Sequence, residues 1–371
     1  MRDKKLKVLL VHSTLHVGGA EEVSANICRR INRDEFDVHA CFLKEKGVIA
    51  EKIESEGTTV HAVGDPARTR PDYLTWWKLR KLVAREQFQI IHSHDVHSLV
   101  DGSICRLVSP GLRHVHTFHF GNYPERETDL RRLERVTWRI PDRLVAVSEH
   151  QRQGIRELYG IPDDRIETVW NGVDVLPPIQ PVPEIERYRG KAVIIGSVNT
   201  LIRQKGMPEL VRAARLLKEK TTVPFVFIIA GGGVLLDELR ALVAEQGVEQ
   251  EVIFLDWVKQ APQCVLPYVD IFFQPSNWEA MSIVLLEAMA LRKPVVATTV
   301  GETPRIITDS ENGMLVARGN VTAMADALQK LVENEGLRKT LGSRASQHYE
   351  TNFTASCLAR RHEELYRSLV R

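Results

Sequence analysis

The sequence lacks paired cysteines, a long apolar run and a large net charge, and each absence excludes a class of protein. None of its five cysteines forms a C-x-x-C pair, which suits free thiols in a reducing compartment (Cys28, Cys41, Cys105, Cys264, Cys357). No stretch approaches the roughly 18 apolar residues of a membrane-spanning helix. A net charge of +2 over 371 residues gives no reason to expect nucleic-acid binding. We therefore expect a globular, cytoplasmic protein.

Two short motifs are also absent. No G-x-G-x-x-G follows a predicted strand, which counts against a nicotinamide-dependent oxidoreductase, a class that shares doubly wound sheets. No Asp-x-Asp is present, so a diphosphate would be bound by basic side chains and helix N-termini. A metal site stays an alternative among the closely spaced histidines, although no acidic or thiol cluster accompanies them (His92, His94, His97, His114, His116). We expect neither a metal nor a cofactor.

Short β-branched runs alternate with helical patterns along the chain, which predicts parallel sheets covered by helices. Seven strands are expected before residue 175 and six after residue 190: KVLLVHS, DVHACFL, TVHAVG, QIIHSHD, HVHTFHF, RLVAVSE and IETVWNG, then AVIIGSV, FVFIIAG, VIFLDWV, DIFFQPS, PVVATTV and GMLV. The proline-rich residues 176–190 predict a stiff linker. The fold class is thus α/β, with two doubly wound Rossmann-like domains (1–175 and 191–353), a cleft between them and a terminal helix (354–371).

The stretch NWEAMSIVLLEAMALRKPVVAT places Glu279 before a helix and Glu287 inside it. Ser282 is a predicted N-cap that leaves backbone N–H groups from Ile283 onward for a hydroxyl or an anion. A buried carboxylate is costly unless it has a partner, so both glutamates are candidate ligand-binding residues. The alternative is a solvated charge at Glu279 and an ion pair between Glu287 and a neighbour such as Arg292.

Other candidates follow the ends of predicted strands. Arg203 and Lys205 lie on the loop after the first strand of the second domain, where cations match a diphosphate leaving group. Glycines permit close backbone approach in two loops, although a simple turn would also use them (Gly231 and Gly232 in the second domain, Gly18 and Gly19 in the first).

The motifs GGAEEVSANIC, IIHSHD, TFHF, AVSE, WNGVD, KGMPELVRAARLL, VIFLDWV, DIFFQPS, SNWEAMSIVLLEAMALRKPVVAT and ENGMLV occur in the order found in one family. The chain resembles family 4 of the retaining glycosyltransferases, which have the GT-B fold. That resemblance implies an acceptor-side first domain, a nucleotide-sugar-binding second domain, and a C-terminal helix that crosses back to the first domain.

The resemblance also implies roles for single residues. Glu279 is expected to contact the donor hexose and Glu287 the nucleotide ribose, while His119 lies near the transferring centre. Together with Arg203 and Lys205, Glu279 and His119 are the implied catalytic residues. The implied donor-binding positions are Glu287, Asn199, Gly231, Gly232, Val258, Ala280, Met281, Ser282 and Ile283, and Gly18 and Gly19 are implied on the acceptor side.

The chain departs from the family pattern around the donor site. Thr200 stands where an arginine is usual, and we expect Arg203 to replace it. Ala280 and Asp256 stand where glycine is usual, and the loop 301–305 carries an acid and a base in unusual places. These departures favour an alternative, a non-catalytic protein that binds nucleotide sugars.

The resemblance implies a metal-independent, retaining hexosyltransferase. Its donor would be a UDP- or GDP-linked sugar and its acceptor a glycan or a lipid-linked molecule, as in polysaccharide or lipopolysaccharide biosynthesis. Peripheral binding to an anionic membrane, on its inner face, is predicted for the segment ERETDLRRLERVTWRI. There Arg131, Arg135 and Arg139 recur on one side and Trp138 adds an apolar contact. A solvated helix is the alternative, because acidic residues offset the charge (Glu125, Glu127, Asp129, Glu134).

Overall fold

The computed structural model describes residues 5–16, 18–64, 72, 74–121 and 128–370. The described residues form two compact units, one of residues 1–173 with 355–371 and one of residues 174–354. The segment predicted as a linker lies in the second unit and contains the short helix α7 (Pro183–Tyr188). Among these residues, no helix has the length and apolar character needed to cross a membrane.

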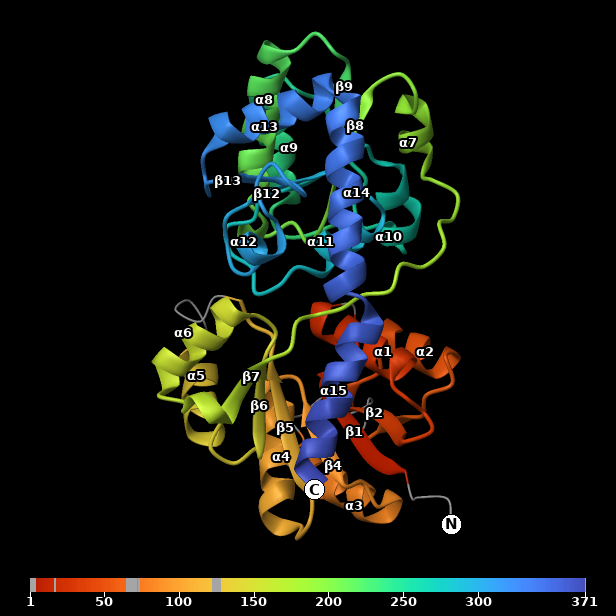
Figure 1. Ribbon diagram of the computed structural model, residues 1–371, viewed down its shortest axis with the longest axis vertical. Helices are drawn as coiled ribbons and strands as arrows, with labels where there is room; N and C mark the ends of the chain where they lie inside the picture. The colour runs from red at the N-terminus through yellow and green to blue at the C-terminus, as the bar shows by residue number, and fades with distance from the viewer. Residues whose placement is uncertain (1–4, 17, 65–71, 73, 122–127, 371) are drawn as a thin grey trace. The chain divides into compact units, whose positions relative to one another are not determined.

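Unit 1 contains a parallel sheet of seven described strands in the order β3-β2-β1-β4-β5-β6-β7. The strands are β1 (Leu6–Thr14), β2 (Phe36–Glu45), β3 (Val60–Ala62), β4 (Ile90–Ser93), β5 (Arg113–Phe118), β6 (Arg143–Ala146) and β7 (Ile166–Thr168). The helices are α1 (Gly19–Arg30), α2 (Val48–Ser55), α3 (Thr75–Glu86), α4 (Val96–Val108), α5 (Thr128–Thr137), α6 (Glu149–Tyr159), the 3-10 turn η2 (Asp163–Arg165) and α15 (Ala355–Val370). The terminal helix α15 packs beside α1, as Figure 1 shows in blue.

Unit 2 repeats the design with six described parallel strands in the order β10-β9-β8-β11-β12-β13. The strands are β8 (Val193–Val198), β9 (Phe225–Ala230), β10 (Val252–Phe254), β11 (Ile271–Gln274), β12 (Val295–Thr298) and β13 (Met314–Val316). Besides α7, the helices are η3 (Arg203–Lys205), α8 (Met207–Lys220), α9 (Leu236–Gln246), α10 (Ala261–Cys264), η4 (Leu266–Tyr268), α11 (Ile283–Ala290), α12 (Thr303–Ile306), α13 (Val321–Glu333) and α14 (Glu335–Asn352).

Every predicted strand is present, and the residues of the central strands are mostly buried, as a sheet covered on both faces requires. In β1, β8, β9 and β12 these buried residues form apolar runs, whereas β4 and β5 also bury histidines. In β1, Leu9 and Val11 join one core cluster with residues of α3 and α4, while the alternate residue His12 contacts α1 through Ser24. The five cysteines are free thiols and four are buried, as the sequence indicated.

The strand order reverses at β1/β4 in unit 1 and at β8/β11 in unit 2. In open parallel sheets, ligands bind beyond the carboxyl ends of the strands at this reversal. The loops after β1, β4, β8 and β11 are therefore the places to look for functional side chains.

Candidate functional site

In unit 2, the loops after β8 and β11 are joined by their backbones. The N–H of Asn277 donates to the carbonyl of Gln204 at 2.7 Å, and the Asn277 side-chain amide donates to the carbonyl of Arg203 at 2.8 Å. These bonds fix the turn η3 against the segment that carries Glu279. The two loops at the strand-order reversal thus form one rigid platform.

Glu279 is buried, with 5% of its surface exposed, so the alternative of a solvated loop charge is wrong. Its carboxylate accepts from Lys205 Nζ at 2.6 Å and from Ser276 Oγ at 2.8 Å. Gln204 Nε2 donates to the other oxygen at 3.3 Å. A buried carboxylate needs such partners, and the pair puts an ammonium and a carboxylate side by side at the sheet edge.

Helix α11 begins where the sequence predicted. Ser282 is the N-cap, and its Oγ accepts from the N–H of Leu285 at 3.3 Å and donates to Gln274 Oε1 at 2.7 Å. The positive end of the helix dipole thus lies next to the Glu279 segment. Glu287, one turn further, is half-buried rather than fully buried.

The glycines after β9 were predicted to let the backbone come close to a ligand, and the structure shows Gly231 close to another loop of the protein. Gly231 has φ +146°, and a Cβ there would lie 1.8 Å from the carbonyl oxygen of Asn199. The backbone of Gly231 therefore packs against the loop after β8, and no ligand is needed to explain the glycine. Gly232 is less confined, because its nearest neighbour, the Cβ of Trp257, is 3.8 Å from such a Cβ.

Gly301 supports Glu279 in a way that the sequence did not reveal. Its φ is +54°, and a Cβ would lie 2.0 Å from the carbonyl oxygen of Glu279. The next residue, Glu302, is fully buried, and its N–H donates to the carbonyl of Ala280 at 3.3 Å. The unusual loop 301–305 thus packs directly under the Glu279 segment. Gln204 was also missed, because it is 75 residues from Glu279 and only folding brings them together. Ser276 was missed although it stands three residues before Glu279, where its hydroxyl was a visible candidate partner.

The remaining predicted donor-side residues fall into two groups. Ala280 and Met281 are buried beside Ser282, while Asn199, Val258 and Ile283 are half-buried at the same end of the sheet. Arg203 is exposed and makes no side-chain hydrogen bond or ion pair within the described part of the chain. The structure therefore brings Lys205 to Glu279 but leaves the guanidinium of Arg203 in solvent.

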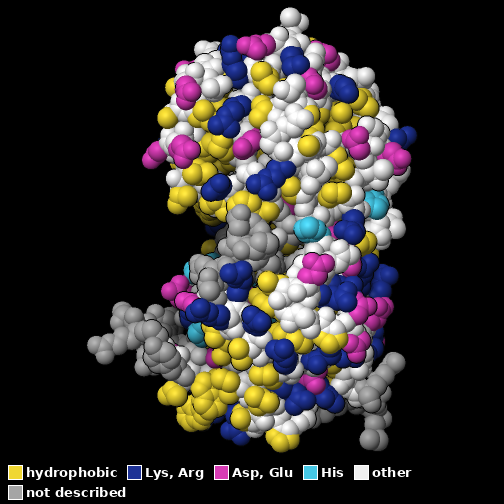
Figure 2. Space-filling model, turned by 90° about the vertical axis from the view of Figure 1, so that its left-hand side faces the viewer, with side chains coloured by type: hydrophobic (Ala, Val, Ile, Leu, Met, Phe, Trp, Pro, Cys, Tyr) yellow, Lys and Arg dark blue, Asp and Glu magenta, His cyan; other side chains and the backbone are white. Residues whose placement is uncertain are grey.

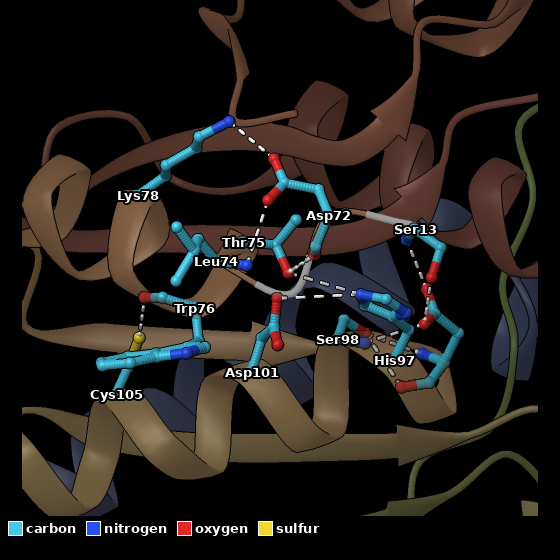
Figure 3. Close-up of polar contacts among 11 residues, drawn as sticks. Ser13, Asp72, Leu74, Thr75, Trp76, Lys78, His97, Ser98, Asp101 and Cys105 are labelled. Atoms are coloured by element: carbon cyan, nitrogen blue, oxygen red, sulfur yellow. Dashed lines mark hydrogen bonds and ion pairs between the residues drawn. The ribbon is translucent and has the colours of Figure 1, made fainter. Parts of the chain in front are cut away.

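In unit 1, the carboxyl end of β1 and the loop after β4 are joined through Asp95. Its carboxylate accepts from the N–H and the hydroxyl of Ser13, each at 2.6 Å, and caps helix α4 by accepting from the N–H of Ser98 at 2.9 Å. Figure 3 shows Ser13 and Ser98 beside His97, whose Nε2 lies 3.9 Å from Asp101 Oδ2 on the same helix. Thr75 Oγ1, from α3, is 3.5 Å from His97 Nε2. These contacts gather hydroxyl, imidazole and carboxylate groups at the carboxyl ends of β1 and β4.

His119 follows β5 and is half-buried at the same edge. Its Nε2 is 3.0 Å from His94 Nδ1, and the two rings stack with centroids 5.3 Å apart. Beneath them, His92 bonds to Tyr366 of α15 and to Thr117, each at 2.7 Å. Burial lowers the pKa of His92 and of His94 well below 6.5, so both rings are neutral at physiological pH.

The predicted acceptor-side glycines precede and open helix α1. Gly18 has an extended backbone, with φ −168°, and a Cβ there would meet only the flexible end of Glu21. Gly19 is exposed. Neither position requires glycine for its conformation.

The histidines that suggested a metal site divide into separate groups. His92 and His94 bond towards α15 and α1, whereas His114 and His116 both bond to Ser93, at 2.8 and 2.9 Å. Within the described residues, no group of three or more His, Cys, Asp and Glu side chains is arranged to hold a metal ion.

Comparisons with known proteins give the class to which this arrangement belongs. The crystal structure of Anabaena HepE in complex with UDP and glucose has a TM-score of 0.84 at 20% identity and covers 98% of this chain and 100% of that chain. Sucrose-phosphate synthase of Thermosynechococcus elongatus has a TM-score of 0.79 at 18% identity, with 98% and 99% covered. The two doubly wound sheets therefore have the GT-B fold.

Two family descriptions cover most of the chain: Glycosyltransferase Family 4 over residues 17–175 and Glycosyl transferases group 1 over residues 180–348. A D-inositol 3-phosphate glycosyltransferase of Corynebacterium urealyticum is 31% identical over 312 residues, 76% of this chain and 72% of that protein. A UDP-Gal:alpha-D-GlcNAc-diphosphoundecaprenol alpha-1,3-galactosyltransferase of Escherichia coli is 24% identical over 352 residues, 90% and 89% of the two chains. The chain belongs to Glycosyltransferase Family 4, and it is a glycosyltransferase with a nucleotide-sugar donor.

Proposed function

We propose that the protein transfers a hexose, with retention of the anomeric configuration and without a metal, from a UDP- or GDP-linked donor to a glycan or lipid-linked acceptor. The observation that carries this proposal is the contact of 2.6 Å between the half-buried Lys205 and the buried Glu279 at the strand-order reversal of unit 2. A cation and a hydroxyl acceptor side by side match a sugar diphosphate, which carries both anionic oxygens and sugar hydroxyls.

The proposed roles follow from the chemistry of each group. Lys205 binds the diphosphate and stabilises the charge that develops as it leaves, with Arg203 reaching in from solvent. Glu279 accepts hydrogen bonds from hexose hydroxyls, and Glu287 from the ribose. Because the ammonium already neutralises Glu279, a neutral hydroxyl can approach the carboxylate at little electrostatic cost.

We assign the retained anomeric configuration of the sugar to a front-face displacement. The bond from the anomeric carbon to the diphosphate breaks, the acceptor oxygen bonds to the same face, and the acceptor proton passes to a diphosphate oxygen. Glu279 is the one carboxylate among the implied catalytic side chains, and Lys205 and Ser276 already bond to it. We therefore assign no covalent intermediate, and the protein contributes position and electrostatic stabilisation.

A lipid-linked acceptor is proposed because the Escherichia coli relative is described as acting on a diphosphoundecaprenol sugar. We place the enzyme in the cytoplasm, on the inner face of the membrane. Helix α5 and the turn that follows it present three exposed arginines, which we name the α5 arginines (Arg132, Arg135, Arg139). Beside them on the helix, Leu133 and Val136 are 47% and 72% exposed. Figure 2 shows basic and apolar side chains mixed on the surface of unit 1.

The structure corrects which residues of this segment face solvent. Trp138 is 4% exposed and packs in a core cluster, so it cannot contact a membrane, and Arg131 is half-buried. Glu134 is also buried, where it accepts from Tyr159 OH at 2.7 Å, and no longer offsets the surface charge. Glu125 and Glu127 lie outside the described residues. The proposed membrane contact therefore consists of the α5 arginines, Leu133 and Val136.

A panel of nucleotide sugars tested by thermal shift examines the proposed donor site. A bound donor raises the apparent melting temperature by mass action, and Lys205→Ala should abolish the shift produced by the best donor. The matched control is Lys218→Ala, which removes a lysine of the same unit that forms an exposed ion pair with Glu251. A donor shift that survives Lys205→Ala would place the diphosphate elsewhere. Binding without transfer or hydrolysis would support the non-catalytic alternative.

A further inference from the structure

Unit 2 has a cavity of about 530 Å³ at the amino ends of β8, β9 and β10. Its walls come from helix α7, the end of α8, the loop between α8 and β9, and the residues that precede β8 and β10. Helix α7 lies beside β8, as Figure 1 shows. We name this space the α7 cavity. Its volume lies within the range of about 300 to 1,000 Å³ that small-molecule sites have.

The α7 cavity lies at the opposite edge of the sheet from the proposed donor site. Ala192, which lines the cavity, precedes β8, whereas Lys205 follows that strand. Because all six described strands of this sheet run parallel, their amino ends form one edge and their carboxyl ends the other. No residue of the proposed donor site lines the α7 cavity.

Three cationic side chains and one carboxylate line the cavity, and two of these four charges neutralise each other. Lys218 Nζ lies 2.9 and 3.0 Å from the two carboxylate oxygens of Glu251. The other two cations, Arg187 and Lys191, form no ion pair with any described residue. The cavity wall therefore has two positive charges without a counter-charge.

The guanidinium of Arg187 is free to bind a ligand. Arg187 is exposed, and its Cζ lies 5.5 Å from the centroid of the Tyr188 ring. Its side chain makes no hydrogen bond among the residues that the structure describes. The planar guanidinium has five N–H donors, whose geometry matches two oxygens of a carboxylate or a phosphate.

Lys191 is held next to Arg187 by the turn that follows α7. The N–H of Lys191 donates to the carbonyl of Tyr188 at 2.9 Å, and Lys191 Nζ donates to the carbonyl of Arg187 at 3.1 Å. An ammonium group has three N–H donors, so two remain for a ligand. The turn thus places a second cation where it can bind the same anionic group as Arg187.

The remaining walls are neutral, and they offer both polar and apolar contacts. Thr222 and Gln250 are exposed, and their side chains form no hydrogen bond within the described part of the chain. A hydroxyl and an amide both donate and accept, which suits the hydroxyl groups of a sugar. Phe225, half-buried at the start of β9, gives the cavity an apolar wall.

We propose that the α7 cavity is a second ligand site, which binds a sugar that carries one anionic group, either a phosphate or a carboxylate. Arg187 and Lys191 bind the anionic group, while Thr222 and Gln250 bind sugar hydroxyls. A neutral sugar would leave both cations without a partner, and inorganic phosphate would leave the hydroxyl-binding groups unused. This inference goes beyond the proposed function, because no residue of the donor site takes part in it.

The test is calorimetry of the full-length protein with four probes: glucose 1-phosphate, glucuronate, glucose and inorganic phosphate. We expect the two anionic sugars to bind more tightly than glucose or phosphate, and the tighter of the two identifies the anionic group. Arg187→Gln should raise the dissociation constant of that sugar about 10-fold or more, the effect of a charged hydrogen bond. Arg189→Gln is the matched control, because Arg189 follows α7, pairs with Glu186 at 3.2 Å and does not line the cavity.

A sugar phosphate could also bind at the donor site, so Lys205→Ala is measured in parallel. The affinity for the anionic sugar should be unchanged in Lys205→Ala, and the backbone amide NMR signals of Thr222 and Gln250 should shift on binding. Binding that Lys205→Ala abolishes and Arg187→Gln does not affect would overturn the proposal. So would the absence of binding by both anionic sugars, or an equal affinity for inorganic phosphate.

The failure of this proposal differs from the failure of the proposed function. An enzyme that transfers sugar but binds neither anionic sugar at the α7 cavity would keep the proposed function and lose the second site. A protein that binds an anionic sugar there, with the loss in Arg187→Gln, but transfers nothing would keep the second site and lose the proposed function.

Discussion

The buried histidines of unit 1 should make the protein sensitive to mild acid. Burial lowers the pKa of His114 to about 3 and that of His362 to about 4, while an unfolded histidine titrates near 6.5. Below pH 6.5 the unfolded chain therefore binds protons that the folded chain does not bind. Stability falls as pH falls through this window and levels off below the folded pKa values.

The size of this loss of stability follows from the difference between the folded and the unfolded pKa of each histidine. Between pH 7 and pH 5, one histidine with a folded pKa near 4 costs about 2 kcal/mol of unfolding free energy. His12, with a folded pKa of about 4, adds a similar amount, so these three groups reach roughly 6 kcal/mol. That loss is comparable to the whole stability of many domains.

The test is the substitution His362→Met. Of the three histidines His12, His114 and His362, this one lies on helix α15. Its Nδ1–H donates to the carbonyl of Leu358 at 2.9 Å, and its Nε2 is buried without a partner among the described residues. Methionine fills the space without a titrating group, so urea unfolding should show about 2 kcal/mol less loss between pH 7 and pH 5 than the wild type.

Leu358→Ala is the control, because it opens a cavity on the same helix and should lower stability equally at both pH values. The unfolding that is measured is that of unit 1, whose core includes Trp138. If His362→Met and the wild type lose the same stability on acidification, the lowered pKa of His362 is refuted.

Three further predictions concern the donor and the membrane. Transfer should survive EDTA, and loss of activity that Mn²⁺ or Mg²⁺ restores would contradict metal independence. Arg203→Ala should weaken nucleoside-diphosphate binding by about 1.5 to 3 kcal/mol in calorimetry, the worth of a charged hydrogen bond, whereas unchanged affinity would make Arg203 a surface charge. Co-sedimentation with phosphatidylglycerol vesicles at low salt should fall about 100-fold when the three α5 arginines become Glu, since each contributes about 1 kcal/mol, and reversal of Arg212 and Arg215 on α8 should have no such effect. Equal sedimentation of the α5 variant and the wild type would leave α5 a solvated helix.

Much of the fold was predictable because it depends on local pattern. The apolar runs gave all the strands of both sheets, and the serine before IVLLEAMA gave the start of α11, where Ser282 caps the helix. Helix α7 was missed because four prolines in the surrounding residues favour an extended linker, although Pro183 stands at the start of that helix, where proline is tolerated.

The contacts that organise the sites were less predictable, because they join residues distant in sequence. Lys205 and Glu279 are 74 residues apart, and His92 and Tyr366 are 274 apart. The helical spacing of the segment ERETDLRRLERVTWRI predicted an exposed Trp138, yet this side chain lies just after α5 and packs in a core cluster with residues of β5 and β6. Arg203 and Lys205 were predicted on the correct loop, but the local pattern does not show which of the two cations turns inward to Glu279.

The Lys205–Glu279 pair allows the proposed transfer reaction to be tested with two site variants. With the donor found by thermal shift and a matching acceptor, the rate of sugar transfer is measured together with the anomeric configuration of the product by NMR. The product should retain the donor configuration, and the rate should fall about 10²- to 10³-fold in both Glu279→Gln and Lys205→Ala, with the fold intact. Glu251→Gln, in the exposed ion pair with Lys218, should retain the wild-type rate. An inverted product, or near wild-type rates in both site variants, would contradict the account.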